Sequence, residues 1–171
     1  MLRSAQARVA FSAGDEATAR KAILDWRERH LRTWNLPLRI VVLVGGDEAV
    51  AALAEEEVAR EIYTELVAYA PIRFQPRMAM SVDAVRGGLA LRLGLIDEAE
   101  AHYSIGLEWT ERERCVIEQG RCLQGLAEVA ERRGRHAEAM QLLDRAGAIF
   151  QQYGIQLYLK RVLAKKEILR A

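Results

Sequence analysis

Few side chains in this sequence are of the types that bind metal ions. The 3 histidines and 2 cysteines are scattered, and no pair of them has a CxxC or HxxxH spacing. Such short spacings aim two ligands at one ion across a single helical turn or tight loop. The sequence therefore predicts no metal site. The side chains concerned are His30, His102, His136, Cys115 and Cys122.

The two cysteines would share one face of a helix, because they are seven residues apart. Two turns would separate Cys115 from Cys122 by roughly 10 Å, which is too far for an unstrained disulfide. We interpret both as small apolar residues of a reducing compartment. Arg3 and Arg8 are followed by no uninterrupted apolar stretch of the kind that targets a chain for export, so we expect a cytoplasmic protein.

The sequence also shows no residue pattern for an activated nucleophile or for a cofactor-binding loop. Ser104 and Thr64 have no histidine or aspartate arranged to activate them. The pair Gly45–Gly46 belongs to no GxGxxG or GK[ST] motif, so no phosphate-binding loop is predicted. We expect no enzyme activity and no cofactor. The competing hypothesis is a small helical enzyme or ligand-binding regulator with a pocket between helices.

The charge balance argues against nucleic acid and membrane surfaces as partners. The chain has 25 basic and 24 acidic residues, a net charge of +1. Arg132, Arg133 and Arg135 are clustered, but they close a predicted helix, where cations suit the helix dipole, and no aromatic residues are interleaved with them. The longest apolar run, Ile40–Val44, is far too short to span a membrane.

The strongest pattern in the sequence is a recurrence of alanine, which bears on the helices that would carry the polar side chains. Alanine recurs every 40 residues, and four residues after each alanine comes a bulky apolar or aromatic residue. Five residues before three of these alanines stands a glycine. A long interval kept over four units is typical of a repeat array. The recurring residues are Ala19, Ala59, Ala99 and Ala139, then Ile23, Tyr63, Tyr103 and Leu143, and the glycines Gly14, Gly94 and Gly134.

Composition and periodicity predict an all-α protein with a single repeat domain over residues 1–171. Hydrophobic residues make up 51% of the chain, and only 3 prolines interrupt it. The predicted units cover residues 1–36, 37–76, 77–114 and 115–154, each an antiparallel helix pair, followed by a helix within residues 155–171. Asp97 is the expected N-cap of one helix. The predicted helices are Ser4–Ala13, Asp15–Arg32, Glu55–Tyr69, Ser81–Leu93, Asp97–Thr110, Cys115–Arg133, His136–Tyr153 and Ile155–Leu169.

The second unit leaves two interpretations open. The repeat interval requires a helix through Ile40–Val44, but this segment is β-branched and is followed by two glycines, which disfavour helix. The alternative is a buried strand, a Gly45–Gly46 turn and a helix that starts at Asp47.

In the fourth unit, small residues at Ala127, Ala139 and Ala146, the turn glycine Gly134 and the large Leu143 resemble the tetratricopeptide repeat. The third unit holds Gly87, Gly94, Ala99, Tyr103 and Gly106 in the same places. The resemblance implies a right-handed α-solenoid that binds other proteins. Three features depart from the family: the interval is 40 residues where about 34 is usual, Trp26 and Leu66 fill the last small position, and the terminal proline is missing.

The segment from Arg121 to Ala139 is similar to the repeat regions of large bacterial signalling proteins. These include ATP-dependent transcriptional activators and ATPases coupled to class III nucleotide cyclases. The similarity implies a protein–protein interaction module that is part or a relative of such a signalling or transcription-regulatory protein.

By analogy with this family, the groove of the array is lined by the first helix of each pair, and it would clamp a peptide or partner helix. The competing interpretation is an ordinary solvated face with helix pairs such as Glu128–Arg132. The final helix either caps the last pair or begins a fifth one, and self-association through it is a further alternative. The predicted groove residues are Arg8, Phe11, Glu48, Arg92, Arg121, Gln124, Glu128 and Arg132.

Overall fold

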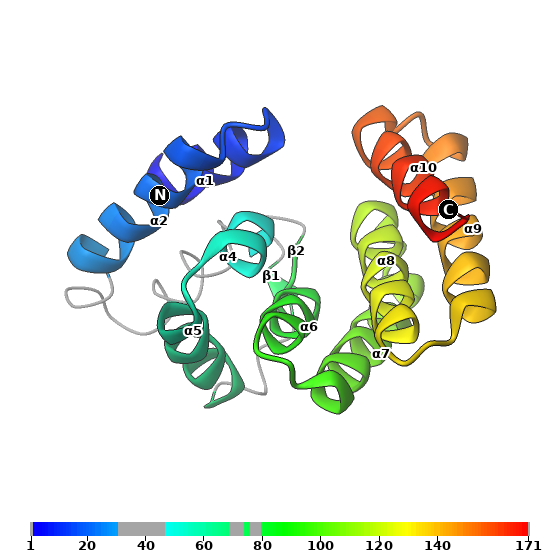
Figure 1. Cartoon of the computed structure of the whole chain (residues 1–171), viewed down its shortest axis with the longest axis horizontal. Helices are drawn as coiled ribbons and strands as arrows, with labels where there is room; N and C mark the ends of the chain where they lie inside the picture. Colours follow the sequence, from blue (N-terminus) through cyan, green and yellow to red (C-terminus); the bar gives the residue numbers. More distant parts are fainter. Residues whose placement is uncertain (1, 31–46, 69–73, 76–79, 171) are drawn as a thin grey trace.

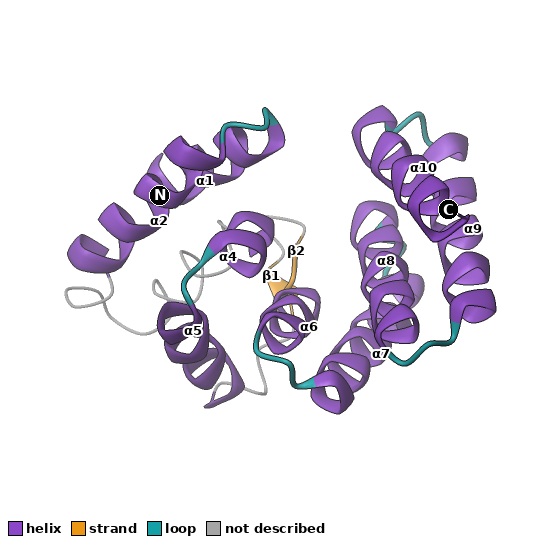
Figure 2. Cartoon of the chain, viewed as in Figure 1, coloured by secondary structure: helices purple, strands orange, loops and turns teal. Residues whose placement is uncertain are grey.

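The computed structural model describes residues 2–30, 47–68, 74–75 and 80–170, and within these ranges the chain is helical apart from one short pair of strands (Figures 1 and 2). The strands β1 and β2 form an antiparallel pair inside the long connection predicted before the third unit. The all-α prediction is confirmed for the described residues. The elements are α1 (Leu2–Ser12), α2 (Glu16–His30), α4 (Asp47–Leu53), α5 (Glu56–Ala68), β1 (Phe74–Gln75), β2 (Met80–Ser81), α6 (Val82–Arg92), α7 (Ile96–Arg112), α8 (Val116–Arg132), α9 (His136–Gln152) and α10 (Gln156–Arg170).

The helices pack mainly against their neighbours in sequence. Close packing joins α1 to α2, and then joins α6, α7, α8, α9 and α10 in succession. The helices follow an arc in Figure 1, with the blue α1 and α2 at one end and the orange and red α9 and α10 at the other. None of the described helices is long and apolar enough to cross a membrane.

The turns between paired helices share one backbone geometry. Gly94 and Gly134 have φ angles of +74° and +73°, in the left-handed region that glycine adopts without strain. The residue after each glycine donates its N–H to a carbonyl five residues back, from Leu95 to Ala90 at 2.9 Å and from Arg135 to Ala130 at 2.8 Å. This is the Schellman ending of a helix. The predicted glycine breaks are therefore confirmed at these positions.

The recurring alanines lie where helices touch. Ala19, Ala59, Ala99 and Ala139 each expose 0% of their surface. A methyl side chain at such a position allows two helix backbones to approach closely. The 40-residue spacing of these alanines therefore coincides with buried positions of the helices.

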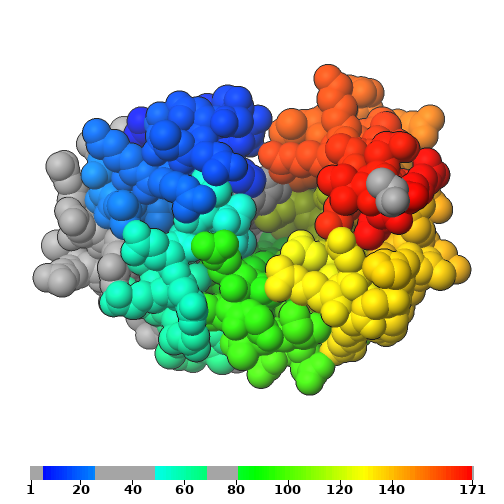
Figure 3. Space-filling model, viewed as in Figure 1, coloured from blue at the N-terminus to red at the C-terminus, as the bar shows by residue number. Residues whose placement is uncertain are grey.

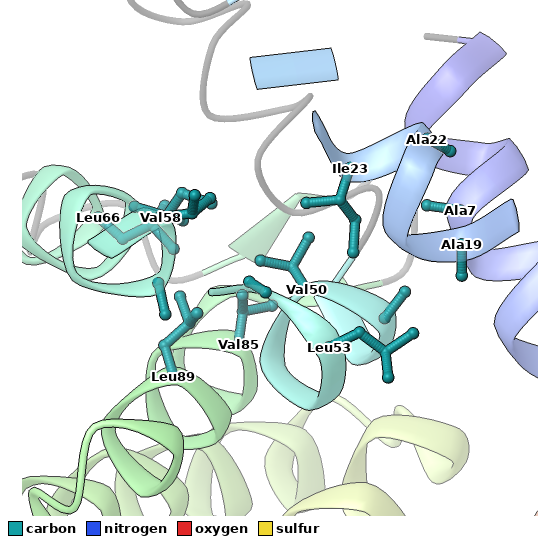
Figure 4. Close-up of a cluster of buried hydrophobic side chains, with 14 of the residues drawn as sticks. Ala7, Ala19, Ala22, Ile23, Val50, Leu53, Val58, Leu66, Val85 and Leu89 are labelled. Atoms are coloured by element: carbon teal, nitrogen blue, oxygen red, sulfur yellow. The ribbon is translucent and has the colours of Figure 1, made fainter. Parts of the chain in front are cut away.

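The buried residues that the structure describes form three hydrophobic clusters along the chain. One cluster joins α1, α2, α4, α5 and α6, where Ile23 points toward Val50 and Leu53 (Figure 4). A second cluster is built on α8, α9 and α10 around Phe150, which exposes 0% of its surface. Cys122 and Tyr103 belong to a third cluster between them.

Two details of the predicted helix starts are wrong. The first helical residue of α7 is Ile96, its N-cap is Leu95, and no side chain caps it, so Asp97 lies in the first turn. Asp97 instead forms an ion pair with Arg133. The other predicted start, Ser81, is itself the N-cap of α6, where its hydroxyl accepts a hydrogen bond from the Ala84 N–H at 3.2 Å.

The second unit is described only from Asp47 onward. Its first described element is α4 (Asp47–Leu53), and Ile40–Val44 lies outside the described residues, so the two interpretations of that segment stay open.

Candidate functional site

A cavity of about 380 Å³ lies on the face formed by α1, α4, α6, α8 and α10. Figure 3 shows the surface hollowed between the blue N-terminal helices and the orange to red C-terminal helices. Apart from Tyr103 on α7, every described residue that lines this cavity comes from those helices, which alternate along the chain with α2, α5, α7 and α9. The helices α1, α4, α6 and α8 are first helices of the predicted pairs, which the sequence assigned to the groove, whereas α10 was not assigned to it.

The cavity exists because the facing positions of α4, α6 and α8 carry very small residues. Ala51, Ala84, Gly88 and Gly125 all line it. A Cβ atom on Gly88 would lie 3.0 Å from the Cβ of Ala51, so even a methyl group would crowd this point. Small residues thus set how closely α4 and α6 approach, and they leave the space above them unfilled.

The structure brings six of the eight predicted groove residues together around this cavity. Of the other two, Arg8 is exposed on α1 and does not line it, and the side chain of Glu48 on α4 lies outside the described residues. The six that line the cavity are Phe11, Arg92, Arg121, Gln124, Glu128 and Arg132.

Positive charge predominates among the lining residues. They include the arginines Arg92, Arg121, Arg132 and Arg161, but Glu128 is the only carboxylate among the described lining residues. Glu128 pairs with Arg132 at 3.1 Å, as the helical spacing predicted. The buried carboxylate of Glu118 accepts a hydrogen bond from Arg121 at 2.7 Å. Two of the four cations are thus neutralised in part by neighbours on α8.

Two of the arginines also hold neighbouring helices together. The Nε and Nη2 atoms of Arg92 donate to the carbonyl of Ala54, at 3.1 and 2.7 Å. Arg132, one repeat interval later, donates from Nη1 to the carbonyl of Leu91 at 3.2 Å. Both carbonyls lie at helix C-terminal ends, where the helix dipole favours cations. Sequence reasoning assigned these two arginines either to partner binding or to a solvated helix face, and it missed this structural role.

Sequence reasoning also missed the contribution of α10 to the site. The Arg161 guanidinium carbon lies 5.7 Å from the centre of the Phe11 ring and 5.2 Å from that of Tyr158. Arg161 therefore connects the last helix to the first. Its position follows Arg121 by one repeat interval, and that equivalence was the signal in the sequence that would have identified it.

A second group of ionisable residues joins α5, α6 and α7 away from the cavity lining. Arg86 and Asp83 form a buried ion pair of 2.8 Å, and Arg86 also donates twice to the Leu66 carbonyl at the end of α5. Nearby, the Tyr63 hydroxyl is 3.2 Å from Nε2 of His102. Burial, and then the charge of Arg86, lower the pKa of His102. These contacts tie the three helices together.

The remaining candidates for chemistry are not arranged for it. Cys122 is completely buried, and burial followed by the charge of Glu118 raises its thiol pKa to about 12. A thiol with this pKa stays protonated and is a poor nucleophile. Among the described residues, no three histidine, cysteine, aspartate or glutamate side chains gather as metal ligands.

Comparison with known proteins assigns no relative. No family model matches the chain, and a search of curated proteins finds no significant match.

Proposed function

We propose that the chain is a tetratricopeptide-like binding module that captures a segment of a partner protein on the face formed by the first helices of its pairs. The observation that carries this proposal is the convergence of six predicted groove residues, from α1, α6 and α8, on one cavity. The six residues come from helices that are far apart in the sequence. In a repeat array, the stacking of successive helix pairs brings such residues together.

A right-handed solenoid is the architecture that we propose for the array. Its support is the packing of helices on their sequence neighbours and the repeated Schellman endings at Gly14, Gly94, Gly134 and Gly154. We propose a partner in signalling or transcription control, and the resemblance of the Arg121–Ala139 segment to bacterial signalling proteins supports this part of the proposal.

The side chains of the cavity suit the capture of another chain. Arginine and tyrosine are enriched among the residues that contribute most to binding at protein interfaces, because they combine a large contact surface with polar ends. Arg121, Tyr103 and Tyr158 all line the cavity. Buried neighbours fix Arg121 before binding, and this preorganisation lowers the conformational entropy lost on binding.

Site-specific photo-crosslinking tests this proposal. A photoreactive benzoyl-phenylalanine replaces Gln124, which lines the cavity, or Gln141, an exposed residue of α9 outside the lining. We expect ultraviolet irradiation in cells of the source organism to give a discrete adduct from position 124 and none from position 141. Equal adducts from both positions, or none from either, would contradict the proposal.

The second candidate function is a ligand-binding regulator with no catalytic activity. One observation favours it: the cavity volume of about 380 Å³ falls in the range of roughly 300–1,000 Å³ that is usual for small-molecule sites. The described lining includes arginine, tyrosine, glutamine and glutamate but no histidine, cysteine or serine, which favours binding over catalysis.

A further inference from the structure

We infer that this cavity binds a compact organic anion, a planar ring that carries a carboxylate or phosphate group. The inference depends on the proposed function only in taking the α1, α4, α6, α8 and α10 face as the binding surface. It adds the chemistry of an occupant that fits the cavity itself.

The charge of the lining calls for an anion. Four arginines and one glutamate line the cavity, while the whole chain carries a net charge of only +1. Arg92 contacts the Ala54 carbonyl, and it pairs with no carboxylate in the part of the chain that the structure describes. A carbonyl orients a guanidinium but leaves its charge uncompensated. Arg92 is exposed, so an incoming anionic oxygen can reach it from the cavity.

The amide of Gln124 adds a second polar group at the same surface. Gln124 is half-buried on α8, one turn after Arg121, and its side chain makes no hydrogen bond with the described residues. A partly buried amide without a partner is stabilised by any ligand that accepts its N–H. Arg92, Arg121 and Gln124 together present donors from two helices, α6 and α8.

The aromatic residues call for a ring. Phe11, Tyr103 and Tyr158 line the cavity from α1, α7 and α10. The Arg161 guanidinium already lies over the rings of Phe11 and Tyr158, which shows that planar groups stack on this side. Aromatic pairs prefer offset or edge contacts with ring centres about 4.5–7 Å apart, and a ligand ring in the cavity would gain contacts of this kind.

The volume restricts the ligand to a compact molecule. About 380 Å³ is near the lower end of the range for small-molecule sites. A single ring system with one anionic group is of this size.

The test uses two fluorescent probes that share a ring system. 8-Anilinonaphthalene-1-sulfonate is a ring-bearing anion, and N-phenyl-1-naphthylamine is the same molecule without the sulfonate. We expect the full chain to bind one equivalent of the anion, at least tenfold more tightly than the neutral probe. Equal affinity for the two probes, or no saturable binding of the anion, would overturn the inference.

An isosteric variant locates the site. Gln124→Glu places a carboxylate in the cavity without changing its volume, and Gln141→Glu makes the same change of net charge on the exposed surface of α9. We expect Gln124→Glu to weaken binding of the anionic probe by about tenfold or more, since like charges within a few ångströms repel strongly at a protein surface. We expect Gln141→Glu to bind as the unaltered chain does. Equal losses in both variants would place the probe elsewhere and overturn the inference.

The arginines themselves are poor test positions, because Arg92 and Arg132 also hold helix ends. Ala52 is exposed and lines the cavity, so Ala52→Trp should block it while the fold persists, as checked by circular dichroism. Loss of probe binding in this folded variant is the expected result, and retained binding would contradict it.

Competition separates the two kinds of natural anion. Millimolar benzoate or adenosine monophosphate should displace the probe according to which anionic group fits, and displacement by neither would overturn the inference. These titrations need no partner protein. If the crosslinking experiment fails, the titrations still test the anion site. If the titrations fail, the crosslinking experiment still tests partner binding.

Discussion

The ring of Tyr103 occupies the space that a side chain at Gly125 would need. A Cβ atom on Gly125 would overlap this ring, and one on Gly87 would lie 2.8 Å from three of its carbons. Tyr103 comes from α7, Gly87 from α6 and Gly125 from α8, so one aromatic side chain is wedged between two helices that each carry glycine at the contact. Close approach of three helices therefore depends on two missing side chains.

Gly125→Ala is expected to destabilise the chain for this reason. The added methyl group must displace a ring that is itself held against α6, and overpacking of this kind usually costs about 1–3 kcal/mol. Urea unfolding followed by circular dichroism measures the loss.

The matched control is Gly147→Ala on α9. There a Cβ would lie 3.4 Å from a methyl group of Val162, an ordinary contact. Alanine is also favoured over glycine inside a helix by roughly 0.5–1 kcal/mol. This variant should be as stable as the original chain or more so. If both variants lost the same stability, the wedge would not be the cause.

Ala139→Leu tests the repeat register directly. Ala139 exposes 0% of its surface, so a larger side chain must push α9 away from its neighbours, at a cost of roughly 1–3 kcal/mol. Ala137→Leu, at an exposed position two residues earlier, should leave the melting temperature almost unchanged. An unaltered melting temperature for Ala139→Leu would show that the assigned register is wrong.

The sequence predicted the helices and their breaks wherever glycine or alanine recurred, since these small residues mark tight turns and close helix contacts. It also placed a break between Thr110 and Cys115, but it did not reveal the backbone geometry of that turn, because Arg114 takes the place of a glycine. Arg114 has a φ of +57°, in the same left-handed region as Gly94 and Gly134, and Cys115 donates its N–H to the Thr110 carbonyl at 2.9 Å. An arginine therefore adopts the left-handed conformation at this turn, and its residue type does not predict that conformation.

Arg114→Gly is therefore expected to stabilise the chain slightly. A residue with a Cβ costs about 1–2 kcal/mol in the left-handed region, and the greater flexibility of glycine in the unfolded chain offsets part of the gain. We expect a net gain of about 0.5–1 kcal/mol in thermal or urea unfolding. The converse change, Gly134→Ala, should cost about 1 kcal/mol. A loss of stability in Arg114→Gly would show that its side chain makes a stabilising contact.

The candidate site was predicted in part, because the repeat interval identifies helix faces but not the contacts that each side chain makes. Phe11, Arg121 and Gln124 line the cavity as expected. The carbonyl partners of Arg92 and Arg132 lie in distant segments, and no local pattern specifies them. The charge pattern alone did not separate arginines that hold the fold from arginines that face a ligand.

Stability is expected to fall in mild acid through His102. Burial, and then the charge of Arg86, lower the pKa of His102 in the folded chain, while the unfolded chain keeps the ordinary value of 6.5. As the pH falls below about 6.5, the unfolded state therefore binds a proton first, and protonation favours unfolding. Above that pH both states are neutral at this residue and no effect is expected.

His102→Gln isolates this contribution. Glutamine keeps a polar partner for the Tyr63 hydroxyl but does not titrate. Urea unfolding between pH 7.5 and 5 should show a smaller loss of stability for the variant than for the original chain. Parallel pH profiles for the two proteins would assign the acid sensitivity to other groups.

Removal of the last helix, α10, tests whether this helix caps the last helix pair. Val162 of α10 is completely buried, and the Tyr158 ring stacks on Phe150 of α9 with ring centres 5.2 Å apart. Lys165 pairs with Glu131 at 2.6 Å, and Lys166 pairs with Asp144. A chain that stops at Gly154 would expose Phe150 and lose all these contacts. We therefore expect this truncation to unfold or aggregate, as removal of a terminal cap does in repeat proteins.

Size-exclusion chromatography with light scattering on the full chain and the truncation distinguishes capping from assembly. A truncation that loses its helical circular dichroism supports capping. A folded, monomeric truncation beside a dimeric full chain would instead assign α10 to self-association, through exposed apolar residues such as Leu163 and Ile168. Two stable monomers would rule out both roles.

Val162→Ala provides a milder control, because it removes two buried methyl groups beside Gly147 and leaves the rest of α10 in place. A loss of about 1–3 kcal/mol in that variant would show that α10 stabilises the last pair through this contact.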